Sequence, residues 1–302
     1  MREPPPDASW LETLAATTAG AAADLVRSRW SRHGREASRF GEPTPSDSAF
    51  VSTAEPAEQA KRDLDAASGW TDPLKSFVTT KSSPTDIVTQ TDIDSERLIR
   101  ERLTAATPEA GFVGEEGGAS GQGRRLQWVI DPLDGTVNFW YQLPVLAVSI
   151  AAAVDGVVVA GAVVDVMSGE TFSAARQRGS RLDGEPIHAS SCDALSVALV
   201  TTGFSYQSKT RVAQGALVAR LLPRVRDIRC FGSAALQLCW VGGGRSDGHF
   251  ERDIKIWDYS AGALVAAEAG ATVELPCPEN GGLVIAATPA VFEPLRRLVE
   301  SG

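Results

Sequence analysis

Cysteine and histidine are scarce in this chain of 302 residues, which has four cysteines and three histidines. The cysteines form no Cys-x-x-Cys pair, and His33, His188 and His249 have no metal-ligand spacing. These absences disfavour a disulfide scaffold, a zinc site and histidine catalysis. A Gly-x-Ser-x-Gly nucleophile elbow is also missing, so the sequence gives no support to a serine hydrolase.

Long apolar segments are missing as well. The longest apolar run, residues 145–154, is too short to cross a bilayer. The N-terminal MREPPPDASW lacks the basic and apolar regions of a signal peptide. We therefore expect a cytoplasmic protein that makes no membrane contact.

Positive charge is outnumbered by negative charge. The chain has 29 Lys and Arg residues against 38 Asp and Glu residues, which gives a formal net charge of −9. Such a surface repels the phosphate backbone of nucleic acids, so direct nucleic-acid binding is not expected. An anionic substrate would need bound cations that reverse the local sign of the field.

The chain is large enough for one catalytic unit over residues 1–302, because 43% of its residues are hydrophobic. The N-terminal half, residues 1–190, begins with apolar residues at helical spacing, which predicts an amphipathic helix over Ser9–Trp30. Residues 34–77 are rich in Pro, Ser, Asp and Glu, which predicts a long surface loop. A second helix is expected further on, with Ser95 as its N-cap.

Two β-branched runs, VLAVSIAAAV and VVVAGAVVDV, are separated by Asp155-Gly156. This dipeptide between apolar runs predicts a hairpin, so the sheet is expected to be at least partly antiparallel. Residues 191–302 alternate between strand and helix patterns, which is typical of an α/β half. The chain as a whole is therefore expected to be an α/β protein with layers of helix and sheet.

The segment WVIDPLDGTVNF carries the strongest chemical signal. Asp131 ends an apolar strand and Asp134 follows Pro132, so the two carboxylates can converge on one point, as cation ligands do. Gly135 and Thr136 come at the expected start of a short helix, where free N–H groups favour a phosphate. The alternative interpretation is an Asp-Gly turn that caps a helix.

Further acidic residues lie in three other segments. Glu115 and Glu116 occupy the Gly-rich turn GEEGG, which is more often a solvated loop. Asp258 precedes a helix, where an N-cap is the ordinary interpretation. The segment KSSPTDIVTQTD contains Lys81 and Asp92 and, by itself, is a polar connection into a helix.

The carboxylates become informative as a set. Oxygen donors with no His or Cys among them select a hard cation, Mg²⁺ above all, with Mn²⁺ as a substitute. Four clustered carboxylates could not all ionise without a cation, because they repel one another. A phosphatase uses two or three such ions to activate a water and to neutralise the reacting oxygens. The set is Glu115, Asp131, Asp134 and Asp258.

The segments GEEGG, WVIDPLDGTVNF, WDYSAGALVAAEAGA and KSSPTDIVTQTD resemble the four signature blocks of the inositol monophosphatases. The resemblance covers Trp10 to about Ala287 and looks closest to bacterial SuhB-type members. It implies an αβαβα five-layer sandwich, a homodimer, dependence on Mg²⁺ and sensitivity to Li⁺. The implied reaction is hydrolysis of inositol 1-phosphate, or of a related small polyol phosphate, to the alcohol and inorganic phosphate.

Two alternatives to this function stay open at this point. Histidinol phosphate, fructose 1,6-bisphosphate and adenosine 3′,5′-bisphosphate are substrates of related families that share the metal-binding blocks. An interaction protein with vestigial catalysis is an alternative of another class, because a fold does not determine a function.

The resemblance also implies residue roles. The metal ligands would be Glu115, Asp131, the backbone carbonyl of Leu133, Asp134 and Asp258, with Asp92 holding an outer ion through water. Thr136 and Glu115 would orient and deprotonate the attacking water, and the amides of Gly135 and Thr136 would hold the phosphate. Substrate contacts would include Asp134, Asp258, Glu251 and Ala234, with Lys81 and Glu116 as accessory candidates.

Four positions depart from the family pattern. Gln142 and Gln177 stand where Gly is usual, and His249-Phe250 replaces a common pair of aromatic residues before Glu251. The first departure bears on the rim of the site and the last on the shape of the substrate.

Overall fold

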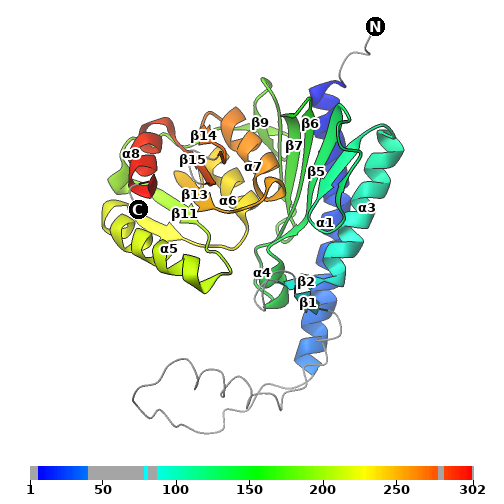
Figure 1. Ribbon diagram of the computed structural model, residues 1–302, viewed down its shortest axis with the longest axis horizontal. Coiled ribbons are helices and arrows are strands. Elements are labelled where there is room, and N and C mark those ends of the chain that lie inside the picture. The colour runs from blue at the N-terminus through cyan, green and yellow to red at the C-terminus, as the bar shows by residue number, and fades with distance from the viewer. Residues whose placement is uncertain (1–5, 40–77, 81–86, 278–281, 301–302) are drawn as a thin grey trace.

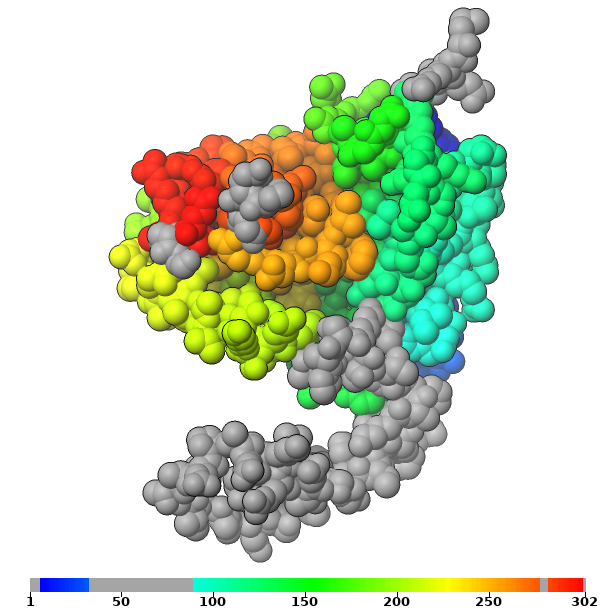
Figure 2. All heavy atoms as spheres, viewed as in Figure 1, coloured from blue at the N-terminus to red at the C-terminus, as the bar shows by residue number. Residues whose placement is uncertain are grey.

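The computed structural model describes residues 6–39, 78–80, 87–277 and 282–300. Two large sheets, a separate two-stranded sheet and three layers of helices make up this part of the chain, as Figure 1 shows. The N-terminal and C-terminal parts lie directly against each other in the space-filling view of Figure 2. The predicted αβαβα five-layer sandwich is therefore confirmed.

The first sheet has eight strands and is antiparallel except where β3 and β5 pair in parallel. Its strand order is β10 (Glu185–Ile187), β9 (Ser180–Leu182), β8 (Thr171–Ala175), β7 (Val157–Asp165), β6 (Ala147–Val154), β5 (Leu126–Asp134), β3 (Gly111–Gly114) and β4 (Gly118–Ser120). The predicted hairpin joins β6 to β7. Both of its turn residues have positive φ, 51° at Asp155 and 81° at Gly156, as a two-residue hairpin turn requires.

The second sheet has five strands. Their order is β12 (Asp227–Arg229), β11 (Leu199–Thr202), β13 (Gly248–Arg252), β15 (Leu283–Ala287) and β14 (Thr272–Glu274). Strand β11 runs parallel to both of its neighbours, whereas β13, β15 and β14 pair antiparallel. A separate pair, β1 (Val78–Thr80) and β2 (Ile87–Thr89), precedes the first sheet in the chain.

Helices cover both faces of each sheet. The helices are α1 (Ala8–Arg39), α3 (Gln90–Ala106), α4 (Thr136–Trp140), α5 (Ser208–Leu221), α6 (Ala234–Gly242), α7 (Ile256–Glu268) and α8 (Pro289–Glu300), with 3-10 turns at Leu195–Val197 and Leu222–Arg224. In Figure 1, α1 and α3 lie outside the first sheet, α6 and α7 lie between the sheets, and α5 and α8 lie outside the second sheet.

Four apolar clusters fill the four interfaces between these layers. Strand β5 shows how one strand serves two of them, because successive side chains point to opposite faces of a sheet. Trp128 and Ile130 pack with α1 and α3, whereas Val129 packs with α6 and α7. The strand is thus buried on both faces, which explains its nearly continuous apolar sequence.

Several expectations about element ends are corrected. Helix α1 continues to Arg39, so residues 34–39 are helical and not part of the predicted loop, and residues 40–77 lie outside the described residues. Thr89, not Ser95, is the N-cap of α3. Ser95 is fully buried inside the helix, where its hydroxyl donates to the carbonyl of Pro132 over 2.8 Å.

Gln142 and Gln177 have positive φ angles of 57° and 63°. Both stand where glycine was expected, and the left-handed conformation explains why glycine suits these turns. The division of the catalytic unit at residue 190 stays a prediction. Within the described part of the chain, no helix is both long and apolar enough to span a membrane.

Candidate active site

A β-bulge brings Asp131 and Asp134 to the same side of the first sheet. Asp131 pairs with Ser149 and Asp134 with Ala147, so three residue steps on β5 match two on β6. Without the extra residue, side chains three positions apart would point to opposite faces. Asp131 is 1% exposed, and its Oδ1 accepts the N–H of Leu133 over 3.0 Å. The predicted convergence of the two carboxylates therefore has a structural cause.

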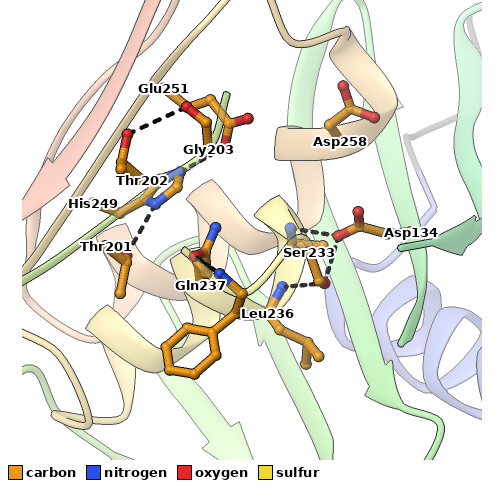
Figure 3. A network of polar contacts seen from close by, with 12 residues as sticks. Asp134, Thr201, Thr202, Gly203, Ser233, Leu236, Gln237, His249, Glu251 and Asp258 are labelled. Carbon is orange, nitrogen blue, oxygen red and sulfur yellow. Dashed lines mark hydrogen bonds and ion pairs between the residues drawn. The ribbon is translucent and has the colours of Figure 1, made fainter. Parts of the chain in front are cut away.

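The carboxylate of Asp134 reaches the N-terminus of α6. Its Oδ2 accepts the hydroxyl of Ser233 over 2.6 Å and the N–H of Ala235 over 2.8 Å, as Figure 3 shows. The backbone of Ala234 also binds this carboxylate. A negative group is favoured at this position because the first N–H groups of a helix lack partners within it. Asp134 thus joins the first sheet to a helix of the middle layer.

Asp258 lies in the first turn of α7. Its Oδ2 accepts the N–H of Lys255 over 2.5 Å, so Lys255 is the N-cap and Asp258 stands three residues further in. The expectation that Asp258 is itself the N-cap is therefore wrong. A carboxylate at this third position still satisfies the helix end, because it binds back to the N-cap N–H.

Asp92 is connected to the turn after β5. Its Oδ2 accepts the N–H and the hydroxyl of Thr89, over 2.9 and 2.5 Å, and its Oδ1 accepts the hydroxyl of Thr136 over 2.9 Å. The Thr136 hydroxyl is also 3.2 Å from the carbonyl of Leu133. Burial raises the pKa of Asp92 to about 6, against the opposing effect of these hydrogen bonds.

Gly135 is the N-cap of α4 and has a φ of 102°, which favours glycine. An added Cβ would also lie 2.8 Å from the carbonyl oxygen of Val145. Asn138 in α4 ties this turn to the other half of the chain, because its Nδ2 donates to Val145 over 2.9 Å and to the carbonyl of Phe231 over 2.7 Å. Asn138 therefore fixes the turn that carries Gly135 and Thr136 to both halves of the chain.

Glu96 holds the turn that carries Glu115 and Glu116, a role that the sequence did not reveal. Its side chain is almost fully buried and accepts the N–H groups of Glu116 and Gly117, over 2.7 and 3.0 Å. Arg100 pairs with Glu96 over 2.6 Å and donates to the carbonyl of Gly118 over 2.7 Å. In SERLIRERL, Glu96 and Arg100 look like an ordinary surface pair one helical turn apart, which is why the sequence gave no signal.

Burial and neighbouring negative charges raise the pKa of three carboxyl groups in the site. Burial first, then the charges of Glu115, Asp134 and Asp258, holds the pKa of Asp131 well above its usual range. Burial and the charge of Asp134 raise the pKa of Asp258 to about 8, while burial raises that of Asp134 to about 6 against its hydrogen bonds. Ionising Asp131, Asp134 and Asp258 together is therefore costly unless a cation compensates.

Glu251, at the C-terminal end of β13, faces the same group of charges. Burial, followed by the charges of Asp134 and Asp258, raises the pKa of Glu251 to about 8. Figure 3 shows Glu251 and Asp258 on separate elements, with Asp134 beside α6. The site thus extends from β5 in the first sheet to β13 in the second.

The donor chemistry fits a hard cation, because every candidate side chain is an oxygen donor and the charges are uncompensated. Among the described residues, however, no three His, Cys, Asp or Glu side chains are arranged as a ready metal cluster. The ligand assignments of Glu115, Asp131, Leu133, Asp134, Asp258 and Asp92 therefore stay predictions. Lys81 lies outside the described residues.

Comparison with known proteins agrees with this architecture. The profile of the inositol monophosphatase family matches residues 48–300. An inositol-1-monophosphatase of Mycobacterium leprae is 47% identical over 253 residues, covering 79% of this chain and 84% of the relative. A protein named Nus factor SuhB, of Pasteurella multocida, is 41% identical over 68% of this chain and 76% of its own length.

A solved structure named Mycobacterium tuberculosis SuhB superposes with a TM-score of 0.72 and 36% identity, covering 98% of both chains. The inositol monophosphatase from Anabaena gives a TM-score of 0.73 at 26% identity, over 97% of this chain and 96% of that one. Sequence and fold thus agree over most of the molecule. The chain belongs to the inositol monophosphatase family of phosphatases.

Proposed function

We propose that this phosphatase hydrolyses inositol 1-phosphate, or a closely related small polyol phosphate, to the alcohol and inorganic phosphate in a Mg²⁺-dependent reaction. The observation that carries the proposal is the group of buried carboxylates from β5 and α7 that raise one another's pKa. The mycobacterial relative named inositol-1-monophosphatase supports the choice of substrate.

Glu115, Asp131, the Leu133 carbonyl, Asp134 and Asp258 would hold two or three Mg²⁺ ions, with Asp92 at the outermost ion through water. When bound, such ions lower the pKa of a water and neutralise charge on the reacting oxygens. Mn²⁺ would substitute for Mg²⁺ because both favour oxygen ligands.

The side chains would then position the reactants. The Thr136 hydroxyl donates to Asp92, which leaves its lone pairs free to accept a hydrogen bond from the attacking water. Glu115 would accept the proton of that water, while the N–H groups of Gly135 and Thr136 would hold the phosphate. Glu251 and Ala234 would contact hydroxyl groups of the polyol, and Glu116 would assist beside Glu115.

Phosphate release from a panel of substrates tests the proposal. Inositol 1-phosphate, histidinol phosphate, fructose 1,6-bisphosphate and adenosine 3′,5′-bisphosphate would each be assayed with Mg²⁺ and with a chelator. We expect inositol 1-phosphate to give the highest kcat/KM and the chelator to abolish turnover. A clear preference for histidinol phosphate would overturn the choice of substrate.

Asp131→Asn is the matched control for this assay, because it keeps the shape of the side chain and removes its charge. We expect at least a thousandfold loss of kcat with a melting temperature no lower than that of the wild type, since an amide relieves the repulsion among the carboxylates. Activity that survives the substitution would show that the ligand assignment is wrong.

Two further properties are part of the proposal. The family resemblance implies a homodimer, which sedimentation would show directly, and inhibition by Li⁺, which the phosphate assay would show.

A second candidate function comes from relatives that carry the name Nus factor SuhB. Such a role would not need turnover. If Asp131→Asn replaced the wild-type protein in cells that require it, the non-catalytic role would be favoured.

A further inference from the structure

A buried imidazole lies next to Glu251 and takes no part in the reaction proposed above. His249 is fully buried in β13, and its Nδ1 is 3.0 Å from the hydroxyl of Thr201 on the paired strand β11. Its Nε2 is also buried and has no hydrogen-bond partner among the described residues. Oε2 of Glu251 is 3.7 Å from Nε2. Figure 3 shows the imidazole between Thr201 and Glu251.

The contacts of Thr201 favour one tautomer of this ring. A hydroxyl has one proton, and the Thr201 hydroxyl is 3.0 Å from Nδ1 but 3.3 Å from the carbonyl oxygen of Gly248. With the hydroxyl proton directed to Nδ1, the ring proton is on Nε2 and faces Glu251.

An N–H group attracts a carboxyl oxygen whether or not the carboxyl is ionised. Burial keeps His249 neutral, since it lowers the pKa of the imidazole to about 3. Oε2 of Glu251 faces Nε2, which leaves the other carboxyl oxygen to accept a hydrogen bond from a ligand.

Gly203, directly after the neighbouring strand β11, limits the position of the Glu251 carboxyl. A Cβ at this residue would lie 2.0 Å from Oε1 and 2.4 Å from Oε2 of Glu251. No carbon can occupy that space, so Glu251 rests directly on the backbone that follows β11. His249 and Glu251 lie two residues apart on one strand and thus face the same side of the second sheet.

We propose that His249 is a positioning residue for Glu251, and that together with Gly203 it sets the orientation in which this carboxyl recognises a hydroxyl group of the substrate. The inference rests on the proposed function, because it assigns the hydroxyl to the alcohol part of the phosphate ester. Under this proposal, the end of the site between β11 and β13 selects the alcohol part of the substrate and takes no part in the phosphate chemistry.

Two substrates separate specificity from chemistry. Inositol 1-phosphate offers hydroxyl groups to Glu251, whereas p-nitrophenyl phosphate offers none. For His249→Phe, which keeps an aromatic ring and removes Nε2, we expect KM for inositol 1-phosphate to rise about tenfold, the worth of one hydrogen bond. We expect kcat for p-nitrophenyl phosphate to stay within about twofold of the wild type. Gly203→Ala should give the same pattern from the other strand.

Two variants act as controls. His249→Gln restores a hydrogen-bonding group and should recover most of the loss in KM. Ser246→Ala, just before β13, removes another buried polar atom that has no hydrogen-bond partner in the described part of the chain, and should leave KM for both substrates unchanged. Equal effects of His249→Phe on both substrates, or none on either, would overturn the proposal.

Nitrogen-15 spectra of the His249 ring test the same arrangement without turnover. We expect a protonated Nε2 and an unprotonated Nδ1, with a shift of the Nε2 signal in Glu251→Ala. An unprotonated Nε2 would contradict the inference. A wild-type protein that releases phosphate from neither substrate would instead contradict the proposed function, and the spectra would then decide the inference alone.

Discussion

Two regions of the site hold a carboxylate in opposite ways. On the α3 side, the turn of Glu115 is held by the ion pair of Glu96 and Arg100, in which the arginine keeps part of its surface in solvent. On the β13 side, Glu251 lies beside the neutral ring of His249, which has no exposed surface. The charged support, Glu96 with Arg100, holds its turn through an ion pair, whereas the neutral support, His249, depends on an imidazole that burial keeps uncharged.

Breaking the charged support should have the largest effect. Glu96→Ala leaves two N–H groups of the turn and Arg100 without their common acceptor, and breaking a buried pair by removing one partner costs about 3 kcal/mol. We expect a stability loss of that size in urea denaturation and at least a hundredfold fall in kcat. The exposed Glu101 on the same helix is the matched control, and an equal effect of Glu101→Ala would contradict the assignment.

The buried neutral imidazole of His249 should make the free energy of unfolding depend on pH in the acid range. Because burial lowers the pKa of His249 from 6.5 to about 3, the unfolded chain binds one more proton than the folded chain between these values. This contribution to stability is fully present above pH 6.5 and is lost as the pH falls toward 3. Removing it in His249→Phe should reduce the dependence of the unfolding free energy on pH by about 1.4 kcal/mol per unit in this window. Parallel curves for the two proteins would contradict the burial of a neutral imidazole.

Two glycines provide a further test of the comparison. In each region, a carboxylate packs directly against the backbone of one glycine. A Cβ at Gly114 would lie 2.2 Å from Oε1 of Glu96, and one at Gly203 would lie 2.0 Å from Glu251. Gly114→Ala should displace the Glu115 turn and lower kcat about tenfold for both inositol 1-phosphate and p-nitrophenyl phosphate. Gly203→Ala should change KM for the polyol ester alone. The same pattern in both variants would mean that the two supports serve one purpose.

The sequence predicted those features that depend on neighbours along the chain. The Asp155-Gly156 hairpin follows from turn chemistry, and the approach of Asp131 to Asp134 follows from the three-residue spacing around Pro132. The layered fold came from resemblance to a family, since alternation of strand and helix does not determine how two sheets stack.

The sequence does not reveal features that depend on contacts between residues far apart in the chain. Glu96 binds N–H groups twenty residues further along, so its helical spacing to Arg100 concealed the contact that matters. Local sequence favours Ser95 as a helix cap. The structure buries Ser95 against Pro132 instead, through a tertiary contact that local sequence does not reveal. His249 was noted only as a departure from a family pattern, because nothing in the sequence shows that its Nε2 is buried beside Glu251.

The side chain of Asn138 has a consequence for how the protein is made. One of its two amide acceptors, the carbonyl of Phe231, lies 93 residues further along the chain. During synthesis, β5 and its two aspartates leave the ribosome long before that acceptor exists. The turn that would grip phosphate is therefore completed only after most of the polypeptide has been translated, so a nascent chain carries the acidic residues before it has a finished catalytic centre.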